Sequence, residues 1–246
     1  MDVQLLINGL HVDAHYEDAT VQGVFLPLLE CLSARQKALG CRLIVFLAAP
    51  PATGKSTLCT FLESLSQQRP PLVALQTLGM DGFHYHQDYI LTHSVLRDGQ
   101  EIPMQLIKGA PETFDAEKLA QALRLLQRQD LRWPIYDRRI HDVVEDALPV
   151  SAPIALVEGN WLLLDDPRWS ALPRDVTIFI HAEETLLRDR LIDRKMAGGF
   201  SREKATAHYL RSDAPNVRRC LNESMPADIV LEMTVEGDYR VQSWNF

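Results

Sequence analysis

The chain opens with alternating apolar and polar positions. Val3, Leu5 and Ile7 alternate with polar residues, and the alternation resumes from Leu10 to Tyr16, after Asn8-Gly9. An Asn-Gly pair between two alternating segments is typical of a β-hairpin with a tight primed turn. The pattern therefore predicts an N-terminal hairpin.

A helical pattern follows. Apolar side chains in residues 20–39 recur three or four positions apart, which predicts a helix with one buried face. That face consists of Val21, Val24, Phe25, Leu28, Leu29 and Leu32. We expect residues 1–40 to form a hairpin-helix extension that packs on the rest of the protein. The pattern assigns this extension no chemistry.

From residue 41 onward, uninterrupted apolar runs alternate with helical patterns. The runs are typical of buried strands and span residues 44–49, 72–78, 153–157, 176–180 and 229–233. The helical patterns cover residues 58–65, 115–126, 183–197 and 201–210, with Asp115 as the N-cap of the second. Residues 86–114 have weak periodicity and several Gly and Pro, so we expect a loop-rich insertion there. Strands alternating with helices predict an α/β fold with a parallel sheet and helices on both faces.

Size and charge narrow the class of protein. A chain of 246 residues can bury one large core, so we expect residues 41–246 to form one domain. The net charge is −8 and no segment concentrates Lys and Arg, so we expect no nucleic-acid partner. The four cysteines are scattered, the first residues do not have the pattern of a signal peptide, and no apolar run approaches a membrane span. We therefore expect a cytoplasmic protein that does not bind membranes.

The turn after the first of these strands has the residues of a phosphate-binding loop. Residues 50–57 read Pro-Pro-Ala-Thr-Gly-Lys-Ser-Thr and lie between an apolar run and a helix. Backbone N–H groups in such a turn point inward and the helix N-terminus adds partial positive charge, so phosphate oxygens are favoured there. In this pattern Lys55 reaches the β- and γ-phosphates of a nucleoside triphosphate, and the Ser56 hydroxyl ligates Mg²⁺. The predicted nucleotide-binding residues are Ala49, Pro50, Pro51, Ala52, Thr53, Gly54, Lys55, Ser56 and Thr57.

One position departs from the phosphate-loop pattern. The pattern begins with Gly, and Ala49 stands at that position. A methyl group fits there if the backbone keeps a negative φ, so the prediction is retained. The alternative is a strand-turn-helix corner in which Lys55 is a solvated cation.

Two carboxylates follow other predicted strands. Asp81 begins the sequence Asp-Gly-Phe-His after the second strand, and Glu158 follows the third. Because ligands bind at the carboxyl ends of parallel strands, we expect both near the phosphate loop. Asp81 could accept the proton of a substrate hydroxyl or help to hold a metal, and Glu158 could hold Mg²⁺ through water. The alternatives are a turn-forming aspartate and a helix-capping or core-edge carboxylate.

Arginines mark the predicted helix 183–197. Arg190 and Arg194 share one face of it, whereas Arg188 points elsewhere. With Gly198-Gly199 behind them, they suit a mobile lid near residues 183–200 that closes over transferring phosphates. The alternative is a solvated face paired to neighbouring acids. No zinc site is predicted, because the histidines at 84, 86 and 93 do not have the Cys or carboxylate partners that zinc requires.

A series of short motifs runs through residues 42–230. It comprises Gly54–Thr57, Asp81–His84, Pro111–Asp115, Tyr136–His141, Glu158-Gly159 and the Arg190–Arg194 helix. In this order the motifs resemble those of the uridine kinase, bacterial pantothenate kinase and phosphoribulokinase superfamily, and most of all a branch labelled fructose-transport-system or nucleoside kinase-like. The resemblance implies an ATP-dependent small-molecule kinase that uses Mg²⁺. It also implies that Asp81 is the catalytic carboxylate, Glu158 the Walker B-like acid, and Arg190 or Arg194 the lid contact to phosphate.

The resemblance also indicates an acceptor pocket. In uridine kinases the Tyr-to-His segment contacts the acceptor, which would place Tyr136 and His141 in the pocket. Pantothenate kinases have a histidine two positions after that tyrosine, whereas Arg138 stands here, which disfavours pantothenate and favours a more anionic acceptor. The predicted substrate-binding residues are His84, Lys108, Tyr136, Arg138 and His141. The alternative for the basic members is a solvated loop.

The leading hypothesis is transfer of the ATP γ-phosphoryl group to an alcohol of a small metabolite, such as a nucleoside, a sugar or a pantothenate-like molecule. The alternative is a non-catalytic ATP-binding switch or a partner-stimulated ATPase, and Asp81 together with Glu158 favours chemistry. No Asn-Lys-x-Asp guanine motif occurs, so a GTPase is not expected. Relatives often form dimers, so a homodimer is one assembly that the resemblance allows.

Overall fold

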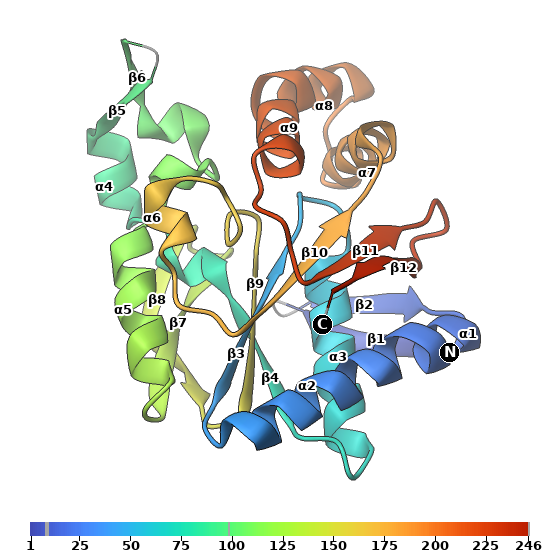
Figure 1. Cartoon of the computed structure of the whole chain (residues 1–246). Coiled ribbons are helices and arrows are strands. Elements are labelled where there is room, and N and C mark those ends of the chain that lie inside the picture. Colours follow the sequence, from blue (N-terminus) through green and yellow to red (C-terminus); the bar gives the residue numbers. More distant parts are fainter. Residues whose placement is uncertain (8–9, 98, 246) are drawn as a thin grey trace.

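A six-stranded sheet lies at the centre of the protein (Figure 1). The computed structural model describes residues 1–7, 10–97 and 99–245. The strand order is β12-β11-β10-β3-β9-β4, and all neighbours are parallel except β11 and β12. The strands are β3 (Leu43–Ala48), β4 (Leu75–Gly79), β9 (Ile154–Gly159), β10 (Val176–His181), β11 (Ile229–Met233) and β12 (Tyr239–Trp244). The predicted α/β class is confirmed, with one antiparallel edge strand added.

Helices cover both faces of this sheet, so the central strand β3 is buried on both of its sides. Leu43, Val45 and Leu47 pack into one core cluster with α2 (Leu26–Leu39) and α3 (Lys55–Gln68). The alternate residues Ile44, Phe46 and Ala48 pack into a second cluster with α5 (Ala116–Leu126) and α6 (Pro167–Ser170). Figure 1 shows α7 (Glu184–Ala197), α8 (Arg202–His208) and α9 (Ala214–Asn222) above the end of β10; the π-helical turn η5 (Tyr209–Asp213) joins the last two.

The predicted N-terminal hairpin is confirmed. β1 (Asp2–Ile7) and β2 (Leu10–His15) pair antiparallel; the predicted Asn8-Gly9 turn lies outside the described residues. α1 (Asp18–Thr20) and the π-helical turn η1 (Val21–Phe25) lead into α2. Tyr16, Phe25, Phe61 and Tyr239 form one aromatic cluster, with ring centroids 4.8–6.2 Å apart. This cluster joins the beginning of the chain, α3 and the last strand.

Residues 86–114 are more ordered than predicted. In place of a loop they form α4 (Gln87–Thr92), the hairpin β5 (Ser94–Arg97) and β6 (Gln100–Pro103), and the 3₁₀ turns η3 (Met104–Ile107) and η4 (Pro111–Thr113). These elements are too short for their periodicity to be recognised in the sequence.

Further elements were not predicted: the hairpin of β7 (Leu131–Asp137) and β8 (Asp142–Val150), the helices α6 and α9, and strand β12. Pro134 and a bulge between Trp133 and Ile135 break the alternation of β7. Strand β4 begins at Leu75 rather than at Leu72, because the Val73 amide donates to the Ser33 hydroxyl instead of to a strand. No helix in residues 1–7, 10–97 and 99–245 is long and apolar enough to cross a membrane.

Candidate active site

The phosphate loop lies between β3 and α3, and the C-terminal strand supports it. Ala52 (φ 70°) and Gly54 (φ 79°) adopt left-handed backbone conformations, whereas Ala49 does not, which meets the condition on which its methyl group was expected to fit. The Tyr239 hydroxyl donates to the Thr53 carbonyl at 2.7 Å, and both residues are buried. A Cβ atom at position 54 would lie 2.7 Å from that hydroxyl oxygen, so only glycine fits. The loop conformation is therefore fixed by a residue of β12.

The first turn of α3 meets the carboxyl end of β9. The Ser56 hydroxyl donates to Glu158 Oε1 at 2.8 Å, and Lys55 Nζ lies 3.9 Å from Glu158 Oε2. Burial raises the pKa of the Glu158 carboxyl, and the nearby Lys55 ammonium opposes that shift. The predicted proximity of the loop and Glu158 is thus present, since β3 and β9 are parallel neighbours in the sheet.

These residues have the donor atoms that Mg²⁺ prefers. A hydroxyl and a carboxylate present hard oxygen ligands side by side at the phosphate loop. The Glu158 carboxylate is desolvated, and Lys55 Nζ, 3.9 Å away, is not in close contact with it, so a divalent cation would relieve an unfavourable buried charge. Ser56 and Glu158 therefore fit a Mg²⁺ ion bound together with a nucleotide.

Asp81 lies just beyond the carboxyl end of β4, in the 3₁₀ turn η2 (Met80–Phe83). A Cβ atom at Gly82 would lie 2.1 Å from the Pro134 carbonyl oxygen, so the glycine allows the β7–β8 hairpin to approach this turn. Arg138, from the end of that hairpin, brings Nη2 to 3.8 Å from Asp81 Oδ2. The turn and the hairpin therefore place a carboxylate and a guanidinium next to the phosphate loop.

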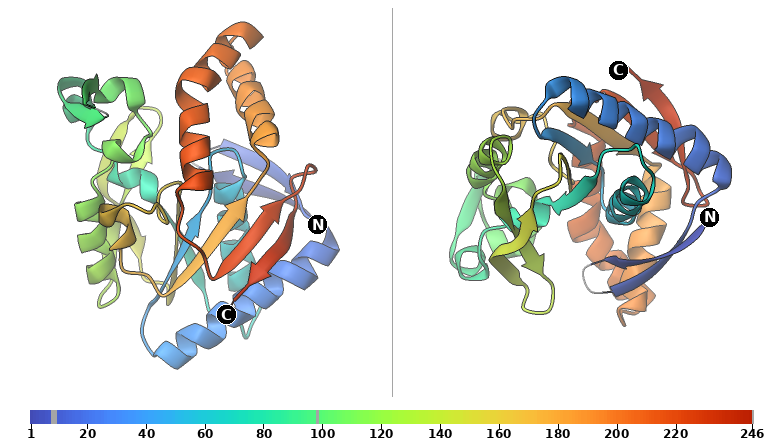
Figure 2. Two further views of the ribbon diagram at one scale, coloured as in Figure 1. Left: turned by 45° about the horizontal axis from the view of Figure 1, so that its top comes forward. Right: turned by 90° about the horizontal axis from the view of Figure 1, so that it is seen from below.

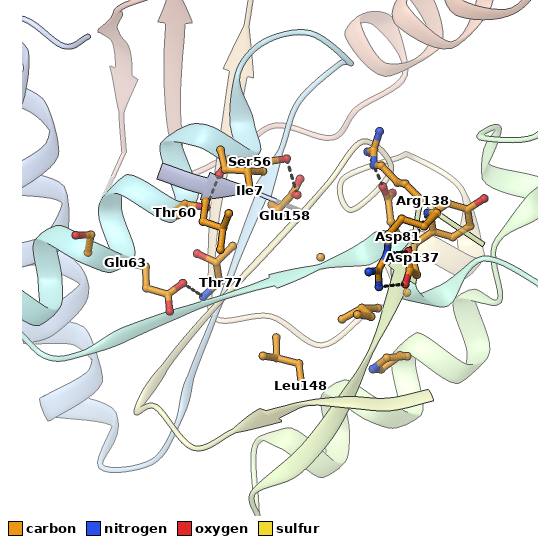
Figure 3. Close-up of a pocket in the computed structure, with 18 of the residues that line it drawn as sticks. Ile7, Ser56, Thr60, Glu63, Thr77, Asp81, Asp137, Arg138, Leu148 and Glu158 are labelled. Atoms are coloured by element: carbon orange, nitrogen blue, oxygen red, sulfur yellow. Dashed lines mark hydrogen bonds and ion pairs between the residues drawn. The ribbon is translucent and has the colours of Figure 1, made fainter. Parts of the chain in front are cut away.

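Two cavities meet at these residues. The phosphate cavity, of about 600 Å³, is lined by the loop and by α7. The second cavity, of about 840 Å³, lies between α3, β4, the β7–β8 hairpin and the end of β1. Both are lined by Ser56, Asp81, Arg138 and Glu158. Figure 3 shows these four side chains across the top of the second cavity, with the Ser56–Glu158 and Asp81–Arg138 contacts dashed.

The phosphate cavity also receives the predicted lid arginines. Arg190 and Arg194 both line it, and neither guanidinium forms an ion pair with a carboxylate in the described part of the chain. Arg188, in contrast, bonds to Asp189 at 2.9 Å. The structure therefore brings together the two arginines that share a helix face and leaves the third outside. The side-chain oxygen of Asn160, which sequence reasoning missed, also faces this region and has no hydrogen-bond partner among the described residues.

The predicted substrate-binding residues are spread over different places. Tyr136 and Arg138 line the second cavity, whereas His84 lines the phosphate cavity. Lys108 and His141 line neither of the two; Lys108 Nζ donates to the His141 carbonyl at 3.2 Å and lies 5.0 Å from the centre of the Tyr136 ring. Their role in acceptor binding stays a prediction.

His84 supports the turn that carries Asp81. Its Nδ1 lies 2.9 Å from the Asp81 carbonyl oxygen, to which the neutral imidazole donates, and its ring packs on Phe114 with centroids 3.8 Å apart. Burial lowers the pKa of the imidazole, although the Asp81 carboxylate opposes this shift. His84 is therefore an uncharged packing partner of η2.

Several known proteins are similar to this chain in sequence or structure. The chain is 49% identical to the uncharacterised protein YggC of Escherichia coli, covering 99% of this chain and 100% of that protein. It is 30% identical to a provisionally named uridine kinase of Schizosaccharomyces pombe, covering 78% and 83%. A provisionally named fructose transport system kinase of Silicibacter superposes with a TM-score of 0.72 at 31% identity, covering 86% and 98%. No protein-family model matches the chain.

The chain belongs to the uridine kinase, pantothenate kinase and phosphoribulokinase superfamily. As a P-loop kinase, it carries its phosphate loop between β3 and α3, with Ala49 at the usual first-glycine position.

Sequence reasoning missed much of the second cavity of this P-loop kinase. Five of its lining residues come from one face of α3: Ser56, Thr60, Glu63, Ser64 and Gln67. A polar stripe at helical spacing, opposite the apolar stripe that predicted the helix, could have revealed them. Leu6 and Ile7 also line this cavity, and nothing in the sequence indicates that the hairpin reaches it.

Proposed function

We propose that the protein transfers the γ-phosphoryl group of ATP to a hydroxyl group of a small metabolite. The observation that supports this most is the meeting of two cavities at Ser56, Asp81, Arg138 and Glu158. A nucleotide held by the phosphate loop would direct its terminal phosphate toward that junction, and an acceptor in the second cavity would approach it from the other side. A protein that only senses ATP needs no second cavity there.

The residues of the phosphate cavity would neutralise negative charge. Lys55, which lines this cavity, would reach the β- and γ-phosphates, and Arg190 and Arg194 carry guanidiniums that form no ion pair with a described carboxylate. Ser56 and Glu158 would hold Mg²⁺, which supplies charge neutralisation on the phosphate oxygens when bound. Fixed cations in a cavity stabilise the charge that spreads over the transferring group.

Asp81 is the base in this proposal. The acceptor hydroxyl oxygen forms a bond to the γ-phosphorus, the bond from that phosphorus to the bridging oxygen of ADP breaks, and the hydroxyl proton passes to the Asp81 carboxylate. Arg138, with Nη2 3.8 Å from that carboxylate, would face the phosphoryl group. The products are a phosphate ester and ADP.

A screen of ADP release tests this proposal. Purified protein with MgATP would be assayed alone and with each member of a set of alcohols that includes uridine, fructose, ribose and pantothenate. We expect ADP release that requires one acceptor class and yields the corresponding phosphate ester by mass spectrometry. Hydrolysis that no alcohol stimulates but that a protein partner accelerates would instead identify a nucleotide-driven switch.

A further inference from the structure

A carboxylate near the end of the chain binds the beginning of the chain. Asp238 lies directly before β12, and its Oδ2 atom accepts hydrogen bonds from the Glu17 amide and the Thr20 hydroxyl, both at 2.9 Å. These partners are 221 and 218 positions away in the sequence. Both views in Figure 2 show the N-terminus close to the red β11–β12 hairpin. The N-terminal extension and the last strand are therefore held together by one side chain.

Asp238 also stabilises the start of the long helical segment of the extension. α1, η1 and α2 follow one another without a break over residues 18–39, and the N-cap residue Glu17 makes no capping bond of its own among the described residues. The first amides of a helix lack partners within the helix, and its N-terminus has partial positive charge. The Asp238 carboxylate supplies both an acceptor and a negative charge at this end. The helix start and the turn before β12 are thus stabilised together.

Asp238 orders the turn that leads into β12. Its amide donates to the Thr234 hydroxyl at 3.2 Å, and its carbonyl accepts from the Thr234 amide at 2.8 Å. Its Oδ1 atom accepts from the Tyr239 amide at 2.8 Å. Because the Tyr239 hydroxyl donates to the Thr53 carbonyl, a continuous series of contacts runs from Thr20 through residues 238 and 239 to the phosphate loop.

Aromatic packing joins the extension to both supports of the loop. The rings of Tyr16 and Phe25 lie 6.2 and 6.1 Å from the ring of Tyr239. They lie 4.8 and 5.8 Å from the ring of Phe61 in α3, the helix that begins directly after the loop at Lys55. All four rings are buried. The loop is therefore held between a strand and a helix that both pack on the same N-terminal segment.

We propose that the N-terminal extension is part of the nucleotide site, and that Thr20 and Asp238 are positioning residues for the phosphate loop. Neither is among the described residues that line the phosphate cavity, so they act through Tyr239 rather than by touching the nucleotide. This proposal rests on the proposed function, because it concerns the nucleotide of the same reaction.

Binding of MgADP, measured by calorimetry well below the unfolding temperature of each variant, tests the proposal. Thr20→Val removes the hydroxyl that donates to Asp238 and keeps the branched shape of the side chain. We expect the Kd of MgADP to rise about three- to tenfold, the equivalent of one hydrogen bond. Thr20→Ser restores a hydroxyl and should restore most of the affinity. A lower Tm in Thr20→Val with an unchanged Kd would overturn the proposal, because the contact would then be structural only.

A matched control lies in the same extension. Ser33 in α2 accepts from the Val73 amide at 2.9 Å, away from the Asp238 contacts. Ser33→Ala should therefore lower Tm and leave the Kd of MgADP unchanged. An increase in Kd equal to that of Thr20→Val would show that any loss of stability weakens binding, and would overturn the positioning role.

A double-mutant cycle tests the route through Tyr239. If Thr20 acts on the loop by way of this residue, the effects of Thr20→Val and Tyr239→Phe on the Kd of MgADP should not add. Additive effects would contradict the proposal. Failure of wild-type protein to bind MgADP would overturn the nucleotide site itself, whereas binding without phosphoryl transfer to any alcohol would overturn only the proposed function.

Discussion

The two cavities differ in how the chain builds them. Six of the sixteen residues that line the phosphate cavity come from one contiguous stretch, Pro51–Thr57, and α7 adds three more, among them two arginines. The second cavity draws on β1, α3, β4, η2 and the β7–β8 hairpin, which are far apart in the sequence. A contiguous site depends on local backbone conformation, whereas a dispersed site depends on tertiary packing. The phosphate cavity can therefore be recognised from a sequence motif, whereas the second cavity, the proposed acceptor site, is visible only in the folded chain.

The largest effect should come from the junction, which belongs to both cavities. Asp81→Asn should lower kcat by roughly 10²- to 10⁴-fold, because the amide cannot take the proton of the acceptor hydroxyl. Nucleotide binding, measured by calorimetry, should remain. Asp13→Asn, an exposed carboxylate change in β2, is the control. Full turnover by Asp81→Asn would contradict the base assignment.

A substitution confined to the phosphate cavity should separate the roles of the two cavities. Lys55→Ala should abolish most of the thermal stabilisation by MgADP, which for the wild-type protein amounts to about 2.7 kcal/mol at a ligand concentration of 100 times Kd. Lys204→Ala, on the exposed surface of α8, should behave as wild type in the same melting experiment. If Lys55→Ala kept the full shift in Tm, the loop would not be the nucleotide site.

A smaller effect is expected from the support beneath the loop. Tyr239→Phe removes the hydroxyl that donates to the Thr53 carbonyl and leaves that buried acceptor unpaired, at a cost of about 1–3 kcal/mol in the free energy of unfolding. Nucleotide affinity should also fall, while the acceptor KM stays unchanged. Tyr16→Phe, in the same aromatic cluster, is the matched control. Equal nucleotide affinity in both variants would show that Tyr239 does not position the loop.

The smallest expected effect is on the pH dependence of thermal stability. Because burial lowers the pKa of His84 below its ordinary value of 6.5, the unfolded chain binds this proton more readily than the folded one. The folded state therefore keeps its full stability above pH 6.5, where His84 is neutral in both states. Its free energy of unfolding declines as the pH falls from there toward the lowered pKa of His84. We expect a decline in Tm between about pH 7 and 5.5 that is reduced in His84→Gln. Identical declines in the two proteins would exclude His84 as the source.

The sequence predicted the elements whose residues repeat regularly. The buried runs of β3, β9 and β10 and the stripes of α2, α3 and α5 were all predicted, because burial on one or both sides imposes a period. The β7–β8 hairpin was missed, since Pro134 and a bulge interrupt its alternation. Helix α9 follows a π-helical turn that shifts the helical phase.

The residues of the candidate site likewise fall into those that the sequence predicted and those that it could not predict. Glu158 and Asp81 follow strands, so the topology of a parallel sheet brings them to the loop without further information. Thr77 and Ile7, which line the second cavity, and Tyr239, which bonds to the loop, could not be assigned to the site from the sequence, because only packing brings their segments together. Arg138 was predicted from the family resemblance. The structure adds its contact with Asp81, at 3.8 Å between Nη2 and Oδ2, which the sequence did not indicate.

The bond between Tyr239 and Thr53 joins residues 186 positions apart, and this separation has a consequence for synthesis. The ribosome completes the loop by residue 57, whereas β12, which supports it, is synthesised only after residue 238. Asp238, next to that tyrosine, also receives hydrogen bonds from Glu17 and Thr20 at 2.9 Å. The hydrogen bond to Thr53 is therefore absent while the loop is first exposed on the nascent chain, and it forms once β12 packs beside the N-terminal segment.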